Sequence, residues 1–246
     1  MGINYSAIPV VKTFRARQAI GIFSAFILAM LLTSICVSFL VTQIIGSQSA
    51  TSSVTGADLI MQHLVSLGVA TYVALCLLKS YFPGFTRKRV LEEIGFVKSS
   101  TRLNICAALF GVCFSLFFAR ILGPIFPPGE GFVSNPLMTE TQTGDWIQYL
   151  TAFTVVLIGP AVEEFLYRGV LYKGFSKSWG AYWAGLLVSV VFIVLHNETL
   201  AGGYWLSILA LILNTVLLQV LLVSSGSIIP SIFMHMGLNF ALVLPV

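Results

Sequence analysis

Charged side chains are scarce in this chain of 246 residues. Asp, Glu, Lys and Arg together make up 9% of it, whereas 57% of the residues are hydrophobic and the mean hydropathy is +0.95. This composition excludes a water-soluble globular domain and predicts an all-α, polytopic helical membrane protein. The formal net charge of +4 comes from basic residues gathered in loops, so it does not indicate nucleic-acid binding.

Paired-cysteine patterns and internal repeats are also missing. All four cysteines fall within apolar runs and none has a CxxC-type spacing, so the sequence indicates neither a disulfide framework nor a cysteine zinc site. We find no repeat and no low-complexity tract. We therefore expect a single integral membrane domain over residues 1–246.

Long apolar segments are abundant, and seven of them can cross a hydrocarbon core of about 30 Å. They lie near 19–45, 58–79, 103–123, 147–172, 180–196, 204–223 and 227–245. Twelve of the thirteen Lys and Arg residues lie before the first segment, between the second and third, or at 168–177. The positive-inside rule then predicts a cytoplasmic N-terminus, and we expect an integral protein of a bacterial plasma membrane.

Two connecting segments have a composition of their own. Residues 85–98 place Val90, Leu91, Ile94 and Val97 at helical spacing among basic residues. This predicts a short helix on the cytoplasmic face, with a solvated basic loop as the alternative. The segment 124–146 is rich in proline and glycine, which predicts irregular structure on the outer side.

Two adjacent glutamates, Glu163 and Glu164, lie inside the fourth apolar segment. A carboxylate at bilayer depth costs at least ~2.5 kcal/mol, so such a pair indicates a polar cavity. Glu164 lies one turn before Arg168, the favourable orientation for an ion pair, whereas Glu163 shares its face with Tyr167. We expect Glu164 and Arg168 to form a structural pair and Glu163 to be available for chemistry. Pro160 should kink or open the helix locally.

The chain has only three histidines. His63 stands in the second segment with no other motif around it, so we interpret it as a packing or interfacial residue. His196 ends the fifth segment, and His235 lies one turn before Asn239 in the seventh. Each alone is typical of a helix core, but three apolar helices that deliver Glu, His and His with Asn indicate a common site.

Two chemistries fit these residue types. Glu163 and His196 could activate a water while His235 and Asn239 donate hydrogen bonds to an oxyanion. Alternatively, Glu163, His196 and His235 could bind a zinc ion with an open fourth position. There is no HExxH motif, so zinc lacks its usual sequence support and stays open as a cofactor.

Three ordered motifs resemble those of a known family. EEFLYR (163–168), FIVLH (192–196) and HMGLN (235–239) occur on successive apolar helices and resemble the CAAX-protease and bacteriocin-processing (Abi) family of intramembrane proteases. The resemblance covers about residues 146–246, which would be the catalytic half. It implies an endopeptidase that acts on peptides or on lipidated or membrane proteins among membrane lipids, of either metallo or glutamate type.

The resemblance also implies a role for each motif position. Glu163 and His196 would activate the water, His235 and Asn239 would stabilise the oxyanion, and Glu164 with Arg168 would support them. Counting ~1.5 Å per residue from the predicted cytoplasmic ends places Glu163 about 15 Å deep but His196 about 24 Å deep. We therefore expect the fifth helix to start later than residue 180 or to tilt, with residues 197–203 lining a cavity. A separation of Glu163 and His196 above ~10 Å would contradict the site.

Two other functions remain open from the residues alone. A proton-coupled transporter also uses buried Glu and His, but it needs a continuous path and usually internal repeats. A non-catalytic relative that serves as an immunity factor or scaffold is the third possibility.

Overall fold

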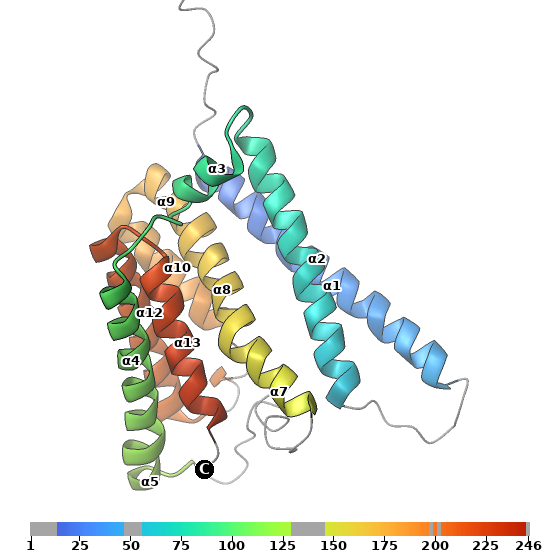
Figure 1. Ribbon diagram of the computed structural model, residues 1–246, viewed down its shortest axis with the longest axis vertical. Coiled ribbons are helices and arrows are strands. Elements are labelled where there is room, and N and C mark those ends of the chain that lie inside the picture. The colour runs from blue at the N-terminus through green and yellow to red at the C-terminus, as the bar shows by residue number, and fades with distance from the viewer. Residues whose placement is uncertain (1–13, 47–55, 129–145, 197–198, 201–202, 245–246) are drawn as a thin grey trace, which may run out of the picture.

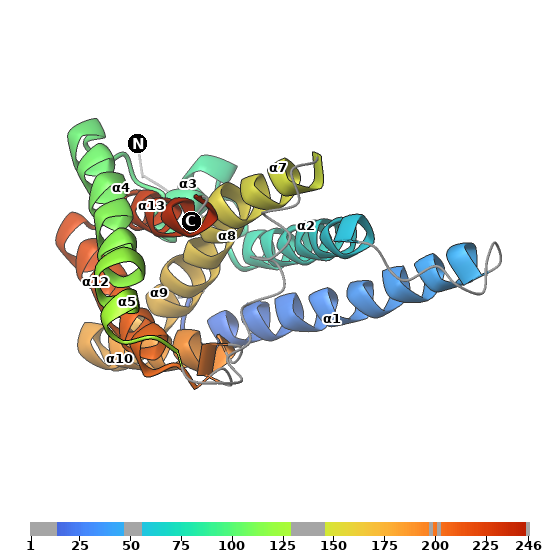
Figure 2. The ribbon, with the colours of Figure 1, turned by 90° about the horizontal axis from the view of Figure 1, so that it is seen from below.

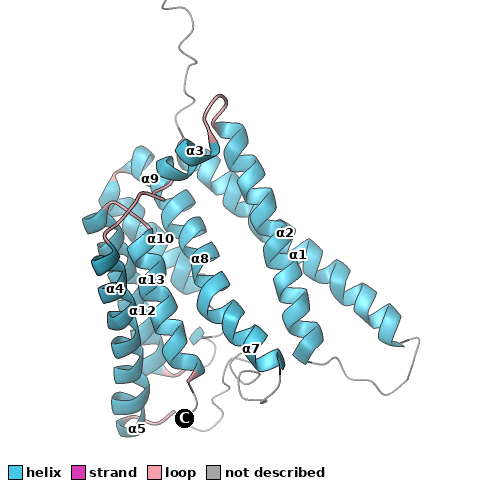
Figure 3. Ribbon diagram, in the orientation of Figure 1, coloured by secondary structure: helices cyan, strands magenta, loops and turns pink. Residues whose placement is uncertain are grey.

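The computed structural model describes residues 14–46, 56–128, 146–196, 199–200 and 203–244. Within these ranges every regular element is a helix (Figure 3). The N-terminal elements are α1 (Ala16–Gly46), α2 (Gly56–Tyr81), the short α3 (Arg87–Glu93), and a third long helix made of α4 (Thr101–Leu116), the π-helical η2 (Phe117–Leu122) and α5 (Gly123–Ile125). The C-terminal elements are the composite fourth long helix, α10 (Ala181–Leu195), α12 (Trp205–Ser225) and α13 (Ile229–Val243).

The fourth long helix runs from Trp146 to Trp179 and is longer than the sequence predicted. It consists of α7 (Trp146–Phe153), η4 (Thr154–Ile158), α8 (Gly159–Glu164), η5 (Phe165–Leu171) and α9 (Tyr172–Trp179), of which η4 and η5 are π-helical. The predicted end at residue 172 is wrong, because the helix continues through α9 to the turn at Gly180.

All seven predicted apolar segments are helical, which confirms the polytopic all-α class. Among the described residues, five helices are long and apolar enough to span a membrane, and α10 and α13 are shorter apolar helices of 15 residues each. The short helix predicted within 85–98 is α3, which begins after the N-cap Thr86. Its residue Val90 and the following Ile94 are buried, whereas Val97 is exposed. Of the predicted irregular segment 124–146, residues 129–145 lie outside the described part.

The helices form a compact group from which the first two stand apart. Helices α4, α8, α10, α12 and α13 pack together, while α1 and α2 pair with each other and diverge from that group toward their far ends (Figures 1 and 2). The start of α1, helix α3, the end of α9 and the start of α4 gather at one end (Figure 1). These elements carry most of the basic residues, so the basic residues gather at one end of the bundle, and the cytoplasmic placement of that end stays a prediction.

Many large apolar side chains lie on the surface of the bundle. Large side chains such as Phe39 on α1, Leu109 on α4 and Val220 on α12 are exposed. In a membrane these side chains contact lipid chains, so their exposure costs nothing comparable to exposure in water. The four cysteines are likewise exposed and free.

Helices α4 and α13 cross so closely that a glycine is required on each of them. A Cβ on Gly111 would lie 2.2 Å from the Met234 carbonyl oxygen, and a Cβ on Gly237 would lie 2.1 Å from the Ala108 carbonyl oxygen. Both obstacles are backbone atoms, which cannot move without separating the helices. Small residues at such crossings let membrane helices approach closely, and here they seat the helix that carries His235.

Substitution of Gly237 by alanine should therefore destabilise the protein. We expect a loss of about 1–3 kcal/mol, as for overpacked cores, measured as a lower thermal midpoint of the detergent-solubilised protein. Gly68→Ala in α2 is the matched control, because nothing lies within 4 Å of its Cβ position. An unchanged midpoint for Gly237→Ala would contradict the close crossing.

Candidate active site

The turn at Gly180 brings Glu163 and His196 together. Gly180 lies 17 residues after Glu163 and 16 residues before His196, and its φ of +82° is the left-handed conformation that favours glycine. Because α9 and α10 form a helical hairpin around this turn, the two side chains reach the same depth. The expectation of a later start for the fifth helix is wrong, since α10 begins at Ala181. The depth discrepancy arose from ending the fourth helix too early.

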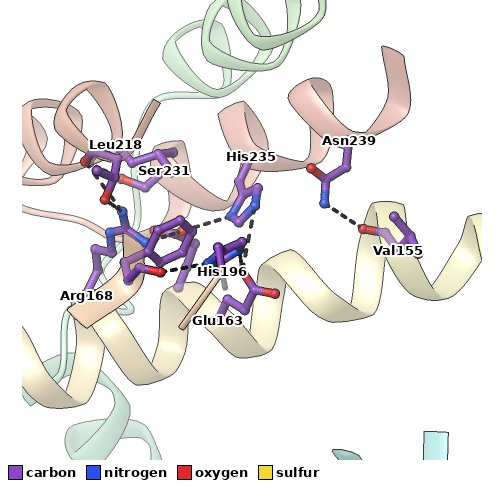
Figure 4. A network of polar contacts seen from close by, with 11 residues as sticks. Val155, Glu163, Arg168, His196, Leu218, Ser231, His235 and Asn239 are labelled. Carbon is purple, nitrogen blue, oxygen red and sulfur yellow. Dashed lines mark hydrogen bonds and ion pairs between the residues drawn. The ribbon is translucent and has the colours of Figure 1, made fainter. Parts of the chain in front are cut away.

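Glu163 faces the ring nitrogens of two histidines. Its Oε2 lies 3.9 Å from His196 Nε2 and 3.8 Å from His235 Nε2 (Figure 4). Both distances are too long for direct hydrogen bonds, but a water between such groups can bond to each of them. Within the described part of the chain, this buried oxygen has no hydrogen-bond donor. The sequence-predicted residues Glu163, His196 and His235 therefore converge on one polar point.

The other nitrogen of each imidazole is already engaged. His196 Nδ1 lies 2.8 Å from the Phe192 carbonyl oxygen, and because a carbonyl only accepts, Nδ1 must donate. His235 Nδ1 lies 3.0 Å from Glu164 Oε1 and donates to that carboxylate. The Phe192 ring also stacks on the His196 ring with centroids 4.2 Å apart. These contacts orient both rings so that each Nε2 faces Glu163.

Glu164 and Arg168 form a fully buried ion pair beneath the site. Arg168 Nη1 donates to Glu164 Oε1 at 2.9 Å, and Arg168 Nη2 donates to Thr215 Oγ1 on α12 at 2.9 Å. The structure thus brings together the pair that the i, i+4 spacing indicated. The expected separation of the two glutamates into independent groups is incomplete, however, because Glu164 also holds His235. Neither that contact nor Thr215 had a local sequence signal, since both join distant helices.

Asn239 lies one turn after His235 and points toward the fourth helix. Its Nδ2 donates to the Val155 carbonyl oxygen in η4 at 2.9 Å (Figure 4). The amide nitrogen carries two hydrogens, so this bond uses one of them. Asn239 therefore bonds to the backbone of the helix that carries Glu163.

A cavity of about 360 Å³ opens beside Glu163 and His196. One wall comes from α8, α10 and the segment after it, and includes Thr199. The opposite wall comes from α1 and α2, and is apolar except for His63. His63 was interpreted as a packing or interfacial residue, and it shares this cavity with two predicted site residues. Its own helix gave no signal of this, because only the tertiary fold brings α2 to the cavity. Of the predicted cavity-lining segment 197–203, residues 197, 198, 201 and 202 lie outside the described part.

The same side chains are the ones that a metal ion would use. Ligand atoms around tetrahedral zinc lie roughly 3.3 Å apart when the bonds are ~2.0–2.1 Å long. The separations of Glu163 Oε2 from the two Nε2 atoms are wider, at 3.8 and 3.9 Å. Over the residues that the structure describes, no group of three His, Cys, Asp or Glu side chains has the geometry of a metal site. As placed, the donors do not fit zinc.

Removal of Glu164 should destabilise the protein much more than removal of the whole pair. Glu164→Gln leaves the charge of Arg168 buried and uncompensated, which typically costs about 3–5 kcal/mol. The double variant Glu164→Gln/Arg168→Met buries no charge and should recover a large part of that loss. Thermal midpoints in detergent measure both effects. A double variant less stable than Glu164→Gln would contradict this account of the pair.

The comparisons with known proteins concern the C-terminal part of the chain. Residues 145–241 match the family model described as type II CAAX prenyl endopeptidase, Rce1-like. Searches among curated proteins and among solved structures give no match. The matched segment contains the composite fourth helix, α10, α12 and most of α13, and therefore all three motifs. The helical unit over residues 145–241 is thus similar to the Rce1-like domain of type II CAAX prenyl endopeptidases.

Proposed function

We propose that this protein is an intramembrane endopeptidase that hydrolyses peptide bonds of membrane-associated or peptide substrates in a bacterial plasma membrane. The observation that supports this most strongly is the buried Glu163 Oε2, which faces two imidazole Nε2 atoms at 3.8 and 3.9 Å. A carboxylate and an imidazole at this spacing can bind one water between them and remove its proton. The family match supports the same class of reaction.

Glu163 is the general base in this proposal. With His196 it binds the attacking water, takes one of its protons, and the water oxygen adds to the substrate carbonyl carbon. The carbonyl π electrons move to oxygen and give a tetrahedral oxyanion. The C–N bond then breaks, and the proton held by Glu163 passes to the leaving amine. General acid–base catalysis of this kind contributes about 10²–10⁴-fold in rate.

His235 and Asn239 supply the donors for the oxyanion. His235 Nε2 donates when the ring carries both protons, and the Glu164 carboxylate accepts the hydrogen bond from Nδ1. The second hydrogen of Asn239 Nδ2 is the other donor. Donors held in place by other bonds stabilise an oxyanion without reorganisation, which makes such sites effective in a water-poor environment.

The cavity walls favour a substrate with an apolar group beside the scissile bond. Phe23, Phe26 and Met30 of α1 face the cavity opposite Glu163. A lipid-modified peptide, or an apolar segment of a membrane protein, can bury its apolar part against this wall. His63 and Thr199, which also line the cavity, offer polar groups for the peptide backbone.

Substitution of Glu163 by glutamine should abolish proteolysis and leave the fold intact. We expect cleavage to fall by about 10²–10⁴-fold because the amide cannot accept the proton of water. The readout is the membrane peptidome of cells that express wild type or Glu163→Gln, followed by cleavage of the peptides so identified in proteoliposomes. Glu93→Gln is the matched control, because its side chain is 36% exposed against 35% for Glu163.

Two outcomes would contradict this proposal. Undiminished cleavage by Glu163→Gln would remove Glu163 from the mechanism. Proton flux in proteoliposomes that depends on Glu163, without any cleavage, would instead support a transporter.

Metal removal should leave the activity unchanged. Glu163, His196 and His235 would be the ligands of any bound zinc, but their separations do not fit one, and the mechanism needs only side chains of this chain. We expect cleavage to persist after dialysis against a strong chelator, with zinc content measured on the same sample. Loss of activity that zinc alone restores would show that the enzyme is a metalloprotease.

A further inference from the structure

Pro160 lies in the middle of the fourth helix, three residues before Glu163. Proline has no backbone N–H, so one carbonyl on the preceding turn must lose its helical donor. An unpaired carbonyl inside a membrane costs several kcal/mol in general, and such groups are therefore satisfied by other donors.

The π-helical turn before the proline identifies that carbonyl. Residues Thr154–Ile158 form η4, and the Gly159 N–H donates to the Thr154 carbonyl oxygen, five residues back. In this register the next hydrogen bond would run from the backbone nitrogen of Pro160 to the carbonyl oxygen of Val155, but proline has no N–H to donate. In a regular α-helix the affected carbonyl would be that of Val156, four residues back. The π turn thus moves the vacancy by one residue, to Val155.

Asn239 fills this vacancy from another helix. Its Nδ2 donates to the Val155 oxygen at 2.9 Å, and its side chain is half-buried. We propose that Asn239 is a positioning residue whose amide replaces the hydrogen-bond donor missing at Pro160 and thereby fixes α13 against the helix that carries Glu163.

The bond has a direct consequence for the site. His235 lies one turn before Asn239 on α13, and Glu163 lies one turn after Gly159 on α8. The Asn239–Val155 bond on one side and the His235–Glu164 bond on the other join the same two helices. Together they set the distance of 3.8 Å between His235 Nε2 and Glu163 Oε2. The effect of this positioning on catalysis rests on the proposed function, whereas its effect on helix packing does not. The positioning role is separate from a direct contact of Asn239 with an oxyanion.

A double-mutant cycle of Asn239 with Pro160 tests the proposal. Asn239→Ala removes the donor, and Pro160→Ala restores a backbone N–H that can bond the vacant carbonyl in either helical register. We expect Asn239→Ala to lower the thermal midpoint by roughly 2–4 °C in the wild-type background and by less than half as much in Pro160→Ala. The loss of cleavage rate caused by Asn239→Ala should also be smaller in the Pro160→Ala background, where only the oxyanion donor is lost. Pro160→Ser restores the same N–H and replaces Pro160→Ala if that variant folds poorly.

Gln62→Ala is the matched control for loss of an amide. Gln62 Nε2 also donates to a carbonyl oxygen on another helix, that of Ser34, at 3.1 Å. Pro160 has no part in that bond, so the effect of Gln62→Ala should be equal in the two backgrounds.

The possible outcomes separate the roles of Asn239. Smaller effects in the Pro160→Ala background on both midpoint and cleavage support the proposal. Equal effects in the two backgrounds overturn it and leave Asn239 with the oxyanion alone. If Asn239→Ala has a smaller effect on the midpoint in the Pro160→Ala background but an equal effect on cleavage in both backgrounds, the proposal is also overturned, because the bond would then be structural only. The midpoints do not depend on proteolysis, so they test the bond even if Glu163→Gln remains active.

Discussion

The carboxylate of Glu164 is the group on which the arrangement of the site depends. It is fully buried and accepts hydrogen bonds from Arg168 on its own helix and from His235 on α13, while Arg168 continues to Thr215 on α12. A buried charge without partners is costly in a membrane, so these contacts favour the packing of the three helices in this arrangement. The Phe192 ring, 4.5 Å from the Arg168 guanidinium, closes the network on the α10 side.

This network also explains the position of the neighbouring carboxylate, that of Glu163. Adjacent helical residues point about 100° apart, so Glu163 faces the cavity while Glu164 faces the bundle. Glu163 then shares its position with two imidazoles whose orientations are fixed by Glu164 and by the Phe192 carbonyl. Two neighbouring residues of one type therefore have different surroundings: one is held by an arginine, and the other faces the cavity, where the proposed function makes it the general base.

The cavity joins two parts of the molecule with different character. The segment that matches the Rce1-like family model, residues 145–241, supplies Glu163, His196 and one wall. The facing wall, with Phe23 and His63, comes from α1 and α2, which lie outside the matched segment and diverge from the compact group of helices (Figure 1). Chemistry and selection of the substrate are thus assigned to different parts of the chain in the function proposed here.

The sequence by itself determined the helical class, the apolar segments and the grouping of Glu163, His196, His235 and Asn239, because composition, residue spacing and motif order are local properties. It also indicated the Glu164–Arg168 pair, since i, i+4 geometry lies within one helix. Only the tertiary structure decided that His235 bonds to Glu164, that Asn239 bonds to Val155, and that His63 shares the cavity, because each joins helices far apart in the chain. The depth of Glu163 was misjudged for a related reason: the end of the fourth helix at Gly180 depends on α9 packing against α1 and α10, which no local pattern reports.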